Sequence, residues 1–159
     1  MKTHMNWKRI AALLLVCCIV SMNTVNLFSQ GGMVSRGEPA LKGYDPVAYF
    51  TLGEAREGDP EITRMYDGRT YRFISQEHRQ MFIADPQAYL PEYDSYCAYA
   101  VAGGSLAPVD PEQWVIHQGR LFLNFNRRTQ RRFVNDLEGM INSADENWPA
   151  LQPRSSEDQ

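Results

Sequence analysis

Residues 62–74 read Ile62-Thr63-Arg64-Met65-Tyr66-Asp67-Gly68-Arg69-Thr70-Tyr71-Arg72-Phe73-Ile74. Two strand-like runs flank Asp67-Gly68, a pair that favours the positive φ angles of a two-residue turn, so the stretch predicts a β-hairpin. Ser75 follows directly and is a preferred helix N-cap residue. The helix is expected to end at Asp85-Pro86, because a residue that precedes proline disfavours helical geometry. The sequence therefore predicts a ββα unit.

A second unit of the same kind lies 51 residues further along the chain, and the two align without a gap. It comprises a strand at 113–117, the turn Gln118-Gly119, a strand at 120–125 and an Asn126-capped helix from residue 127 to about 137. The alignment places Phe133 on Phe82. Two explanations of the gap-free alignment remain open: an internal duplication, or the similar spacing of any two hairpin-plus-helix units. The predicted fold is α+β, a single small domain of two ββα units.

Two shorter helical segments are also predicted. In residues 43–50, Asp45 is the expected N-cap and Pro46 occupies the first helical position, where a missing N–H is tolerated. In residues 96–102, Asp94 or Ser95 is the expected cap and Gly103-Gly104 the stop. This cap would place Cys97 in the first turn of a helix.

The amino terminus has the pattern of a secretory signal peptide. A basic stretch precedes an apolar run of 11 residues, which is too short to cross roughly 30 Å of hydrocarbon as a helix. Cleavage after Ser29 would divide the chain into a signal peptide (1–29), a flexible segment (30–39), a domain (40–152) and a disordered tail (153–159). A retained membrane anchor is the alternative. We expect an exported protein, periplasmic or extracellular, with no stable membrane span after cleavage.

Charge and cysteine content limit the chemistry of the exported form. Cleavage would change the formal net charge from −3 to −6 and leave Cys97 as the last thiol. An acidic exported protein is a poor candidate for binding nucleic acid. The chain has no Ser-His-Asp order, paired-carboxylate pattern, phosphate loop or H-E-x-x-H helix, so hydrolase activity has no support in the sequence.

One spaced pattern resembles the YHS domain: Tyr71-x-Phe73-x-Ser75-x-x-His78-x-x-x-Phe82-x-x-x-Pro86-x-x-Tyr89. With the blocks at 43–50, 96–101 and 147–151, the chain looks like the exported YHS domain-containing proteins of bacteria over nearly all of residues 40–151. Relatives that handle heavy metals carry cysteines in blocks of the form Asp-Pro-Val-Cys and Phe-Cys-Ser-x-x-Cys, which correspond to residues 45–48 and 73–78 here, since thiolates suit copper-like ions. Here Ala48 and Ile74 stand in those positions, and only His78 keeps ligand capacity.

The resemblance also directs attention to Cys97. Exported members keep a cysteine at this position, and some are described as containing selenocysteine, which implies redox or nucleophilic chemistry. The start of a helix favours a thiolate, whereas the apolar neighbours of Cys97 favour a buried, inert residue. Cys97 therefore has three open interpretations: structural residue, redox nucleophile or metal ligand.

The candidate metal site combines Cys97 with the two histidines of the exported form, His78 and His117, as a three-ligand Cys/His set. At both histidines, an exposed side chain without a ligand is the alternative. The resulting hypothesis is an accessory protein that binds a transition metal or small ligand near Cys97 and His78. A thiol-redox protein that uses Cys97, and a non-catalytic structural or protein-interaction module, are the rivals.

Two further patterns allow a binding role. All eight tyrosines lie between Tyr44 and Tyr99, where they can line a ligand pocket or fill the core. Four arginines recur at helical spacing and can hold an anion or an acidic partner, or form a solvated face paired with residues such as Asp136 and Glu138. They are Arg127, Arg128, Arg131 and Arg132.

Overall fold

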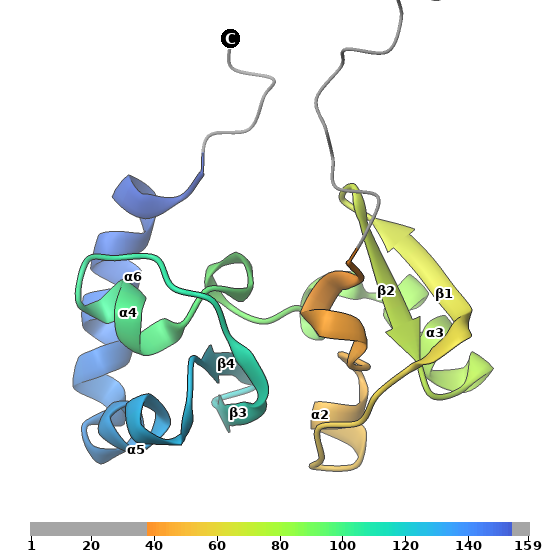
Figure 1. Ribbon diagram of the computed structural model, residues 1–159, viewed down its shortest axis with the longest axis horizontal. Coiled ribbons are helices and arrows are strands. Elements are labelled where there is room, and N and C mark those ends of the chain that lie inside the picture. Colours follow the sequence, from red (N-terminus) through yellow and green to blue (C-terminus); the bar gives the residue numbers. More distant parts are fainter. Residues whose placement is uncertain (1–37, 154–159) are drawn as a thin grey trace, which may run out of the picture. The chain divides into compact units, whose positions relative to one another are not determined.

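The computed structural model describes residues 38–153, shown as the coloured ribbon in Figure 1. The predicted signal peptide, nearly all of the segment 30–39 and nearly all of the tail 153–159 lie outside these residues. Its elements in chain order are η1 (Ala40–Gly43), α2 (Ala48–Thr51), β1 (Asp59–Tyr66), β2 (Arg69–Phe73), α3 (Gln76–Ala84), η2 (Pro86–Ala88), η3 (Tyr93–Ser95), α4 (Ala98–Ala102), β3 (Asp110–His117), β4 (Arg120–Asn124), α5 (Arg127–Asn135) and α6 (Leu137–Leu151).

The first hairpin forms where the turn residues predict it. β1 and β2 pair antiparallel, with Tyr66 opposite Arg69. The turn residues have φ angles of 46° at Asp67 and 70° at Gly68, the left-handed geometry that such a turn requires. Ser75 then caps α3 by accepting a hydrogen bond from the backbone N–H of the third helical residue at 3.1 Å. The predicted ββα unit is confirmed.

The second unit repeats the first with the predicted offset. β3, β4 and α5 each begin 51 residues after β1, β2 and α3. The register irregularity lies between Asp59 and Thr63 in the first hairpin and between Asp110 and Trp114 in the second, again 51 residues apart. Asn126 caps α5 in a reciprocal capping box. The described chain is therefore an α+β domain of two ββα units, as predicted.

The short helices differ from the prediction. α4 begins at Ala98, so Cys97 is its N-cap residue instead of a first-turn residue. Asp94 and Ser95 do not cap it, because both have left-handed φ angles, 54° and 66°, within η3. α2 likewise begins later than expected, although the Asp45 side chain still accepts the backbone N–H of Val47 at 2.8 Å.

The carboxyl-terminal helix α6 was not predicted. The chain turns at Asp136, with φ −136° and ψ 60°, and then forms α6 with Pro149 near its end. α6 packs against α4 and supplies buried Ile141 and Ala144 to the core around Phe133. The apolar residues of α6 recur every three or four positions, so the helical period is present in the sequence, and burial of this face stabilises the helix despite its proline.

Buried side chains in and just before α2 connect the two units, because Val47 packs with Phe73 and Phe82 of the first unit and Tyr49 packs with the second. Tyr49 of α2 is 1 % exposed and clusters with Leu121 and Leu123 of β4. Its ring packs edge-on against Trp114 at 5.4 Å between centroids, and its hydroxyl donates to the carbonyl of Pro111 at 3.0 Å. The described residues belong to one compact unit. None of the helices within residues 38–153 is long and apolar enough to cross a membrane.

Candidate functional site

The carboxylate of Asp45 connects the segment before α2 to the first ββα unit. Asp45 is fully buried, and its Oδ1 accepts the backbone N–H of Val47 at 2.8 Å. Its Oδ2 accepts the backbone N–H of Ile74 at 2.9 Å and lies 2.7 Å from Nδ1 of His78. The Ser75 cap places His78 in the first turn of α3, where it is 8 % exposed. The alternative of a freely exposed histidine at position 78 is therefore wrong.

The other ring nitrogen of His78 faces a hydroxyl group. Nε2 lies 3.2 Å from Oγ1 of Thr51, and Oγ1 also donates to the carbonyl of Val47 at 3.0 Å. Asp45, His78 and Thr51 thus follow the acid, histidine, hydroxyl order of a hydrolase triad. However, the Thr51 hydrogen is used within α2, and Thr51 lines neither of the two cavities described below. We therefore interpret the hydrogen bonds of His78 as a structural connection between α2 and α3.

A metal centre fits these residues poorly. Asp45 alone would suit a metal-binding histidine, because such histidines commonly donate their second N–H to a carboxylate. A metal at Nε2 of His78 would have to displace Thr51, and it would lack further strong ligands. Within residues 38–153, no group of three or more His, Cys, Asp and Glu side chains is arranged to hold an ion. The structure does not bring His78, Cys97 and His117 together.

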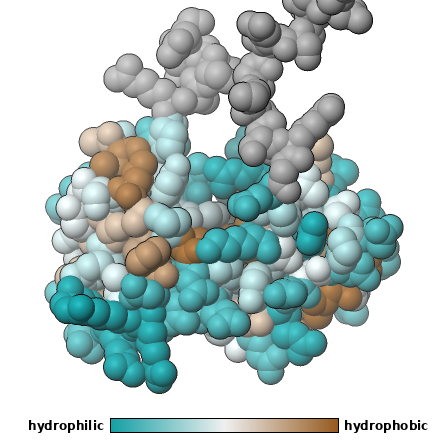
Figure 2. All heavy atoms as spheres, in the orientation of Figure 1, coloured by the Kyte–Doolittle hydropathy of each residue, from teal (hydrophilic) through white to brown (hydrophobic). Residues whose placement is uncertain are grey.

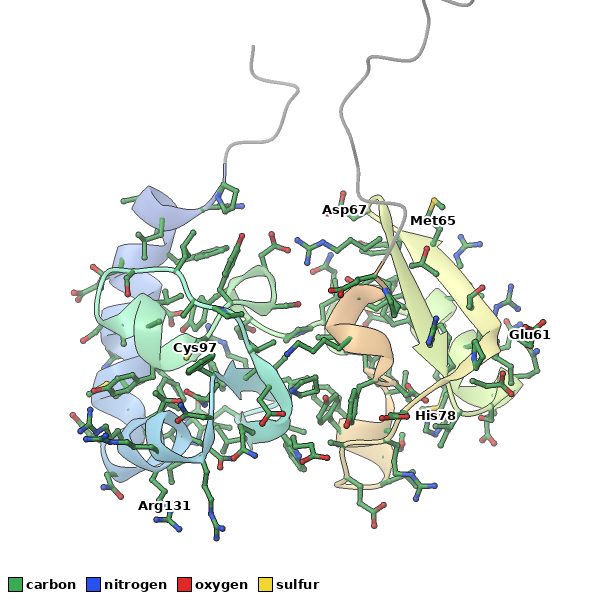
Figure 3. The ribbon with its side chains drawn as sticks, viewed as in Figure 1. Glu61, Met65, Asp67, His78, Cys97 and Arg131 are labelled. Atoms are coloured by element: carbon green, nitrogen blue, oxygen red, sulfur yellow. The ribbon has the colours of Figure 1, made fainter. Side chains whose placement is uncertain are left out.

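Cys97 lies in the core, and Figure 3 shows it well separated from His78. It is 1 % exposed and packs with the cluster that contains Tyr49 and Leu123. Its Sγ accepts the backbone N–H of Phe125 at 3.2 Å and lies 3.9 Å from Oδ1 of Asn124. Asn124 is fully buried, and its Nδ2 has no hydrogen-bond partner among the described residues. The sulfur is therefore enclosed but has polar neighbours.

Cys97 has the same structural position in the second unit as Asp45 has in the first. Asp45 accepts the N–H of Ile74, the residue before the cap of α3, and Cys97 accepts the N–H of Phe125, the residue before the cap of α5. Each also donates its own backbone N–H to a loop carbonyl, at 2.8 and 3.0 Å. Both side chains therefore join the end of a strand to the segment before a short helix.

His117 borders a different feature, a cavity of about 300 Å³ that is also lined by Arg120, Glu138 and Asp145. Arg120 pairs with Glu92 and Asp145, each at 2.8 Å. The hydrogen bonds from Arg120 hold the pKa of Asp145 below its ordinary value. The hydrogen bonds to both carboxylates raise the pKa of Arg120. This charge cluster joins the residue before η3 to β4 and α6, and the sequence spacing of its members matches no ligand motif.

A second cavity has aromatic walls and is a groove of about 460 Å³ that we call the tyrosine groove. Its lining includes Tyr66 and Tyr71 of the first hairpin, Trp148 of α6, and the pair Arg69 and Asp94, which is 2.8 Å apart. Burial raises the pKa of Tyr71 to about 12. Two of the eight tyrosines thus line a cavity, whereas others such as Tyr49 fill the core, so each interpretation of the tyrosines holds for part of them.

The described residues thus contain three candidate functional features: the buried Asp45 and His78 pair, the enclosed Cys97 sulfur and the tyrosine groove. Sequence reasoning selected His78 and Cys97 but missed Thr51 and Asn124, which have no recognisable spacing to their partners. Comparison with known proteins finds no matching family model, no matching curated protein and no matching solved structure.

Proposed function

We propose that this protein is an exported, non-catalytic accessory module of the YHS type that binds a small ligand in the tyrosine groove. The observation that carries the proposal is the groove itself. At about 460 Å³ it has the size of a small-molecule site, and it combines aromatic walls with a few charged groups. In this proposal His78 and Cys97, the residues selected from the sequence, stabilise the fold and do not bind the ligand.

The engagement of His78 and Cys97 supports a structural role for both. Each ring nitrogen of His78 has a partner within 3.2 Å, and Sγ of Cys97 accepts a backbone N–H at the same distance. A ligand at either position would have to remove a buried hydrogen bond, and a buried group left without its partner destabilises the fold by about 1–3 kcal/mol. Ligand binding is more favourable where such bonds are not broken.

The groove suggests the chemistry of its ligand. Tyr66 and Trp148 offer aromatic surface, which favours a flat or apolar ligand body. Arg69 and Asp94 are about 40 % exposed and hydrogen-bond each other, so each can turn one polar atom to a ligand. Gln87 donates to the hydroxyl of Tyr66 at 2.9 Å at the groove wall. We expect a small ligand with one ring and a polar or charged edge.

The test is a screen of ring-containing carboxylates and amines by ligand-observed NMR and by tryptophan fluorescence. A Gln87→Trp variant should block the groove and abolish the binding of any hit. Gln76→Trp, on the exposed first position of α3 and outside the groove, is the matched control and should bind normally. The proposal fails if no compound binds, or if Gln87→Trp and Gln76→Trp bind a hit equally.

Thiol-redox chemistry at Cys97 is the second candidate, because the sulfur has polar neighbours: it accepts the backbone N–H of Phe125 and lies 3.9 Å from Oδ1 of Asn124. It predicts rapid alkylation of the native protein, read on the Cys97 peptide by mass spectrometry. The structural role predicts labelling only after denaturation, because the side chain is 1 % exposed. Fast native labelling would favour redox chemistry over the structural role.

A further inference from the structure

Helix α5 presents four arginines on the side opposite its buried contacts. Phe133 of α5 is fully buried, and Gln130 of the same helix donates to the carbonyl of Trp114 at 2.6 Å. All four arginines are exposed, and helical periodicity places them on the opposite side. Figure 2 shows a strongly hydrophilic surface over α5, at the lower left. We call this surface the arginine face; it consists of Arg127, Arg128, Arg131 and Arg132.

The arginine face has no ion-pair partner among the described residues. Other arginines, such as Arg69 and Arg120, pair with carboxylates at 2.8 Å. The expected pairing with Asp136 and Glu138 does not occur, and the one polar contact is from Arg132 to the hydroxyl of Tyr99 at 3.4 Å. One interpretation of the sequence is a solvated face salt-bridged to residues such as Asp136 and Glu138, and that pairing is wrong. Within residues 38–153 the face is solvated and has no salt bridge.

This arrangement is unfavourable for the isolated helix. Like charges four residues apart repel by about 0.2–0.5 kcal/mol per pair, and the face contains two such pairs. Arg127 and Arg128 also occupy the first turn of α5, which contains no acidic residue, and cations are disfavoured at this end of a helix. A bound acidic surface would relieve both effects.

The same chain carries a matching acidic row at the start of β1. Glu57, Asp59 and Glu61 occupy alternate positions, all three are exposed, and none forms an ion pair within residues 38–153. Oδ1 of Asp59 accepts the backbone N–H of Glu61 at 2.8 Å, so the carboxylates of Glu57 and Glu61 are the two in the row that make no hydrogen bond among the described residues. Figure 3 shows Glu61 at the outer edge of β1 and Arg131 below α5, with both side chains directed away from the ribbon.

The two surfaces carry opposite charges, and neither forms an ion pair within residues 38–153. Guanidinium groups bind carboxylates through paired hydrogen bonds, so two or three arginines can engage successive carboxylates. We propose that the arginine face of one copy of this chain binds the acidic row, Glu57, Asp59 and Glu61, of a second copy.

The charge of the whole chain favours this partner over an anionic membrane. The formal net charge is −3, and without the four arginines it would be −7, so an anionic lipid surface repels most of the molecule. A second copy offers its acidic row locally, and charges further away are screened over about 8 Å at physiological salt. Because the two surfaces differ, the contact is head-to-tail and can extend beyond a dimer unless it closes into a ring.

Charge exchange tests the contact by sedimentation velocity. The wild-type protein at about 100 μM and low salt should form dimers or larger species that dissociate in about 0.5 M salt. Arg127→Glu with Arg131→Glu, and separately Glu57→Arg with Glu61→Arg, should each weaken association at least tenfold. A mixture of these two double variants should associate again, because each supplies the surface that complements the other.

The control changes charge without altering the row. Glu77→Arg with Glu146→Arg, both exposed, adds the same positive charge as the acidic-row variant and should still self-associate. A monomeric wild type, or a mixture of the two double variants that stays monomeric, would overturn the proposal. A different result would also overturn it: the monomeric wild type sediments with phosphatidylglycerol vesicles, and only the α5 variant fails to do so. The arginine face would then be a membrane contact.

Discussion

Replacing Asp45 by alanine is expected to be the most destabilising single change near the candidate site. The variant leaves three donors without an acceptor: the buried backbone N–H of Val47, the partly buried N–H of Ile74, and the buried Nδ1 of His78. Each unpaired buried group destabilises by about 1–3 kcal/mol, although partial relaxation reduces the sum. We therefore expect a loss of about 4 kcal/mol for Asp45→Ala.

Urea unfolding, followed by tryptophan fluorescence and circular dichroism, measures this loss. With a slope of about 2 kcal/mol per molar urea, the midpoint should fall by about 2 M without a change in slope. Asp45→Asn keeps one acceptor oxygen and should lose about 2 kcal/mol, which provides a reading if the alanine variant does not fold. Asp85→Ala removes an exposed carboxylate with one 3.4 Å bond and serves as the control. A loss at Asp45 no larger than at Asp85 would refute the structural role of the pair.

The remaining predictions concern a sulfur, an acid and a tyrosine. Cys97→Ala removes a buried sulfur atom, which is the acceptor of the partly buried backbone N–H of Phe125, and should lower the free energy of unfolding by about 1–2 kcal/mol. A change within error in urea unfolding would contradict this prediction. The low pKa of Asp145 means that its ionised side chain stabilises the fold at pH values above about 3.9, the pKa of the carboxyl in the unfolded chain. This stabilisation is lost as the pH falls through the lower pKa of the folded state. Since 42 % of that side chain is exposed, Asp145→Asn should remove less than about 1 kcal/mol of acid-dependent stability, and identical acid unfolding of both proteins would exclude the effect. Burial raises the pKa of Tyr71 to about 12. The stabilisation linked to its protonated hydroxyl is therefore fully present below about pH 10, the pKa in the unfolded chain, and is lost as the pH rises through the folded-state pKa. Tyr71→Phe should therefore reduce alkaline destabilisation in thermal melts at increasing pH, and an unchanged profile would count against it.

The resemblance to the exported YHS proteins stays a prediction, as does the signal peptide, which lies outside the described residues. The structural findings do not depend on either. The Asp45 and His78 pair, the Cys97 acceptor and the arginine face follow from contacts and burial within residues 38–153. The exported location enters only the proposed function.

Local signals in the sequence determined the two ββα units. Asp67-Gly68 and Gln118-Gly119 require left-handed turns, and Ser75 and Asn126 supply side-chain oxygens to helix N-termini, so turns and caps lie where predicted. These features act over two to four residues, which is why they can be read directly from the chain.

Only the tertiary structure decided which distant groups meet. Asp45 and His78 are 33 residues apart, and Cys97 is 28 residues from the N–H group that it accepts. No local spacing encodes these pairs, because they depend on how the units pack. The same holds for the unpaired arginines of α5, since helical spacing puts them on one face but only the surrounding fold determines whether a carboxylate reaches them. Short-range backbone geometry thus fixed the elements, and long-range burial assigned the roles of their side chains.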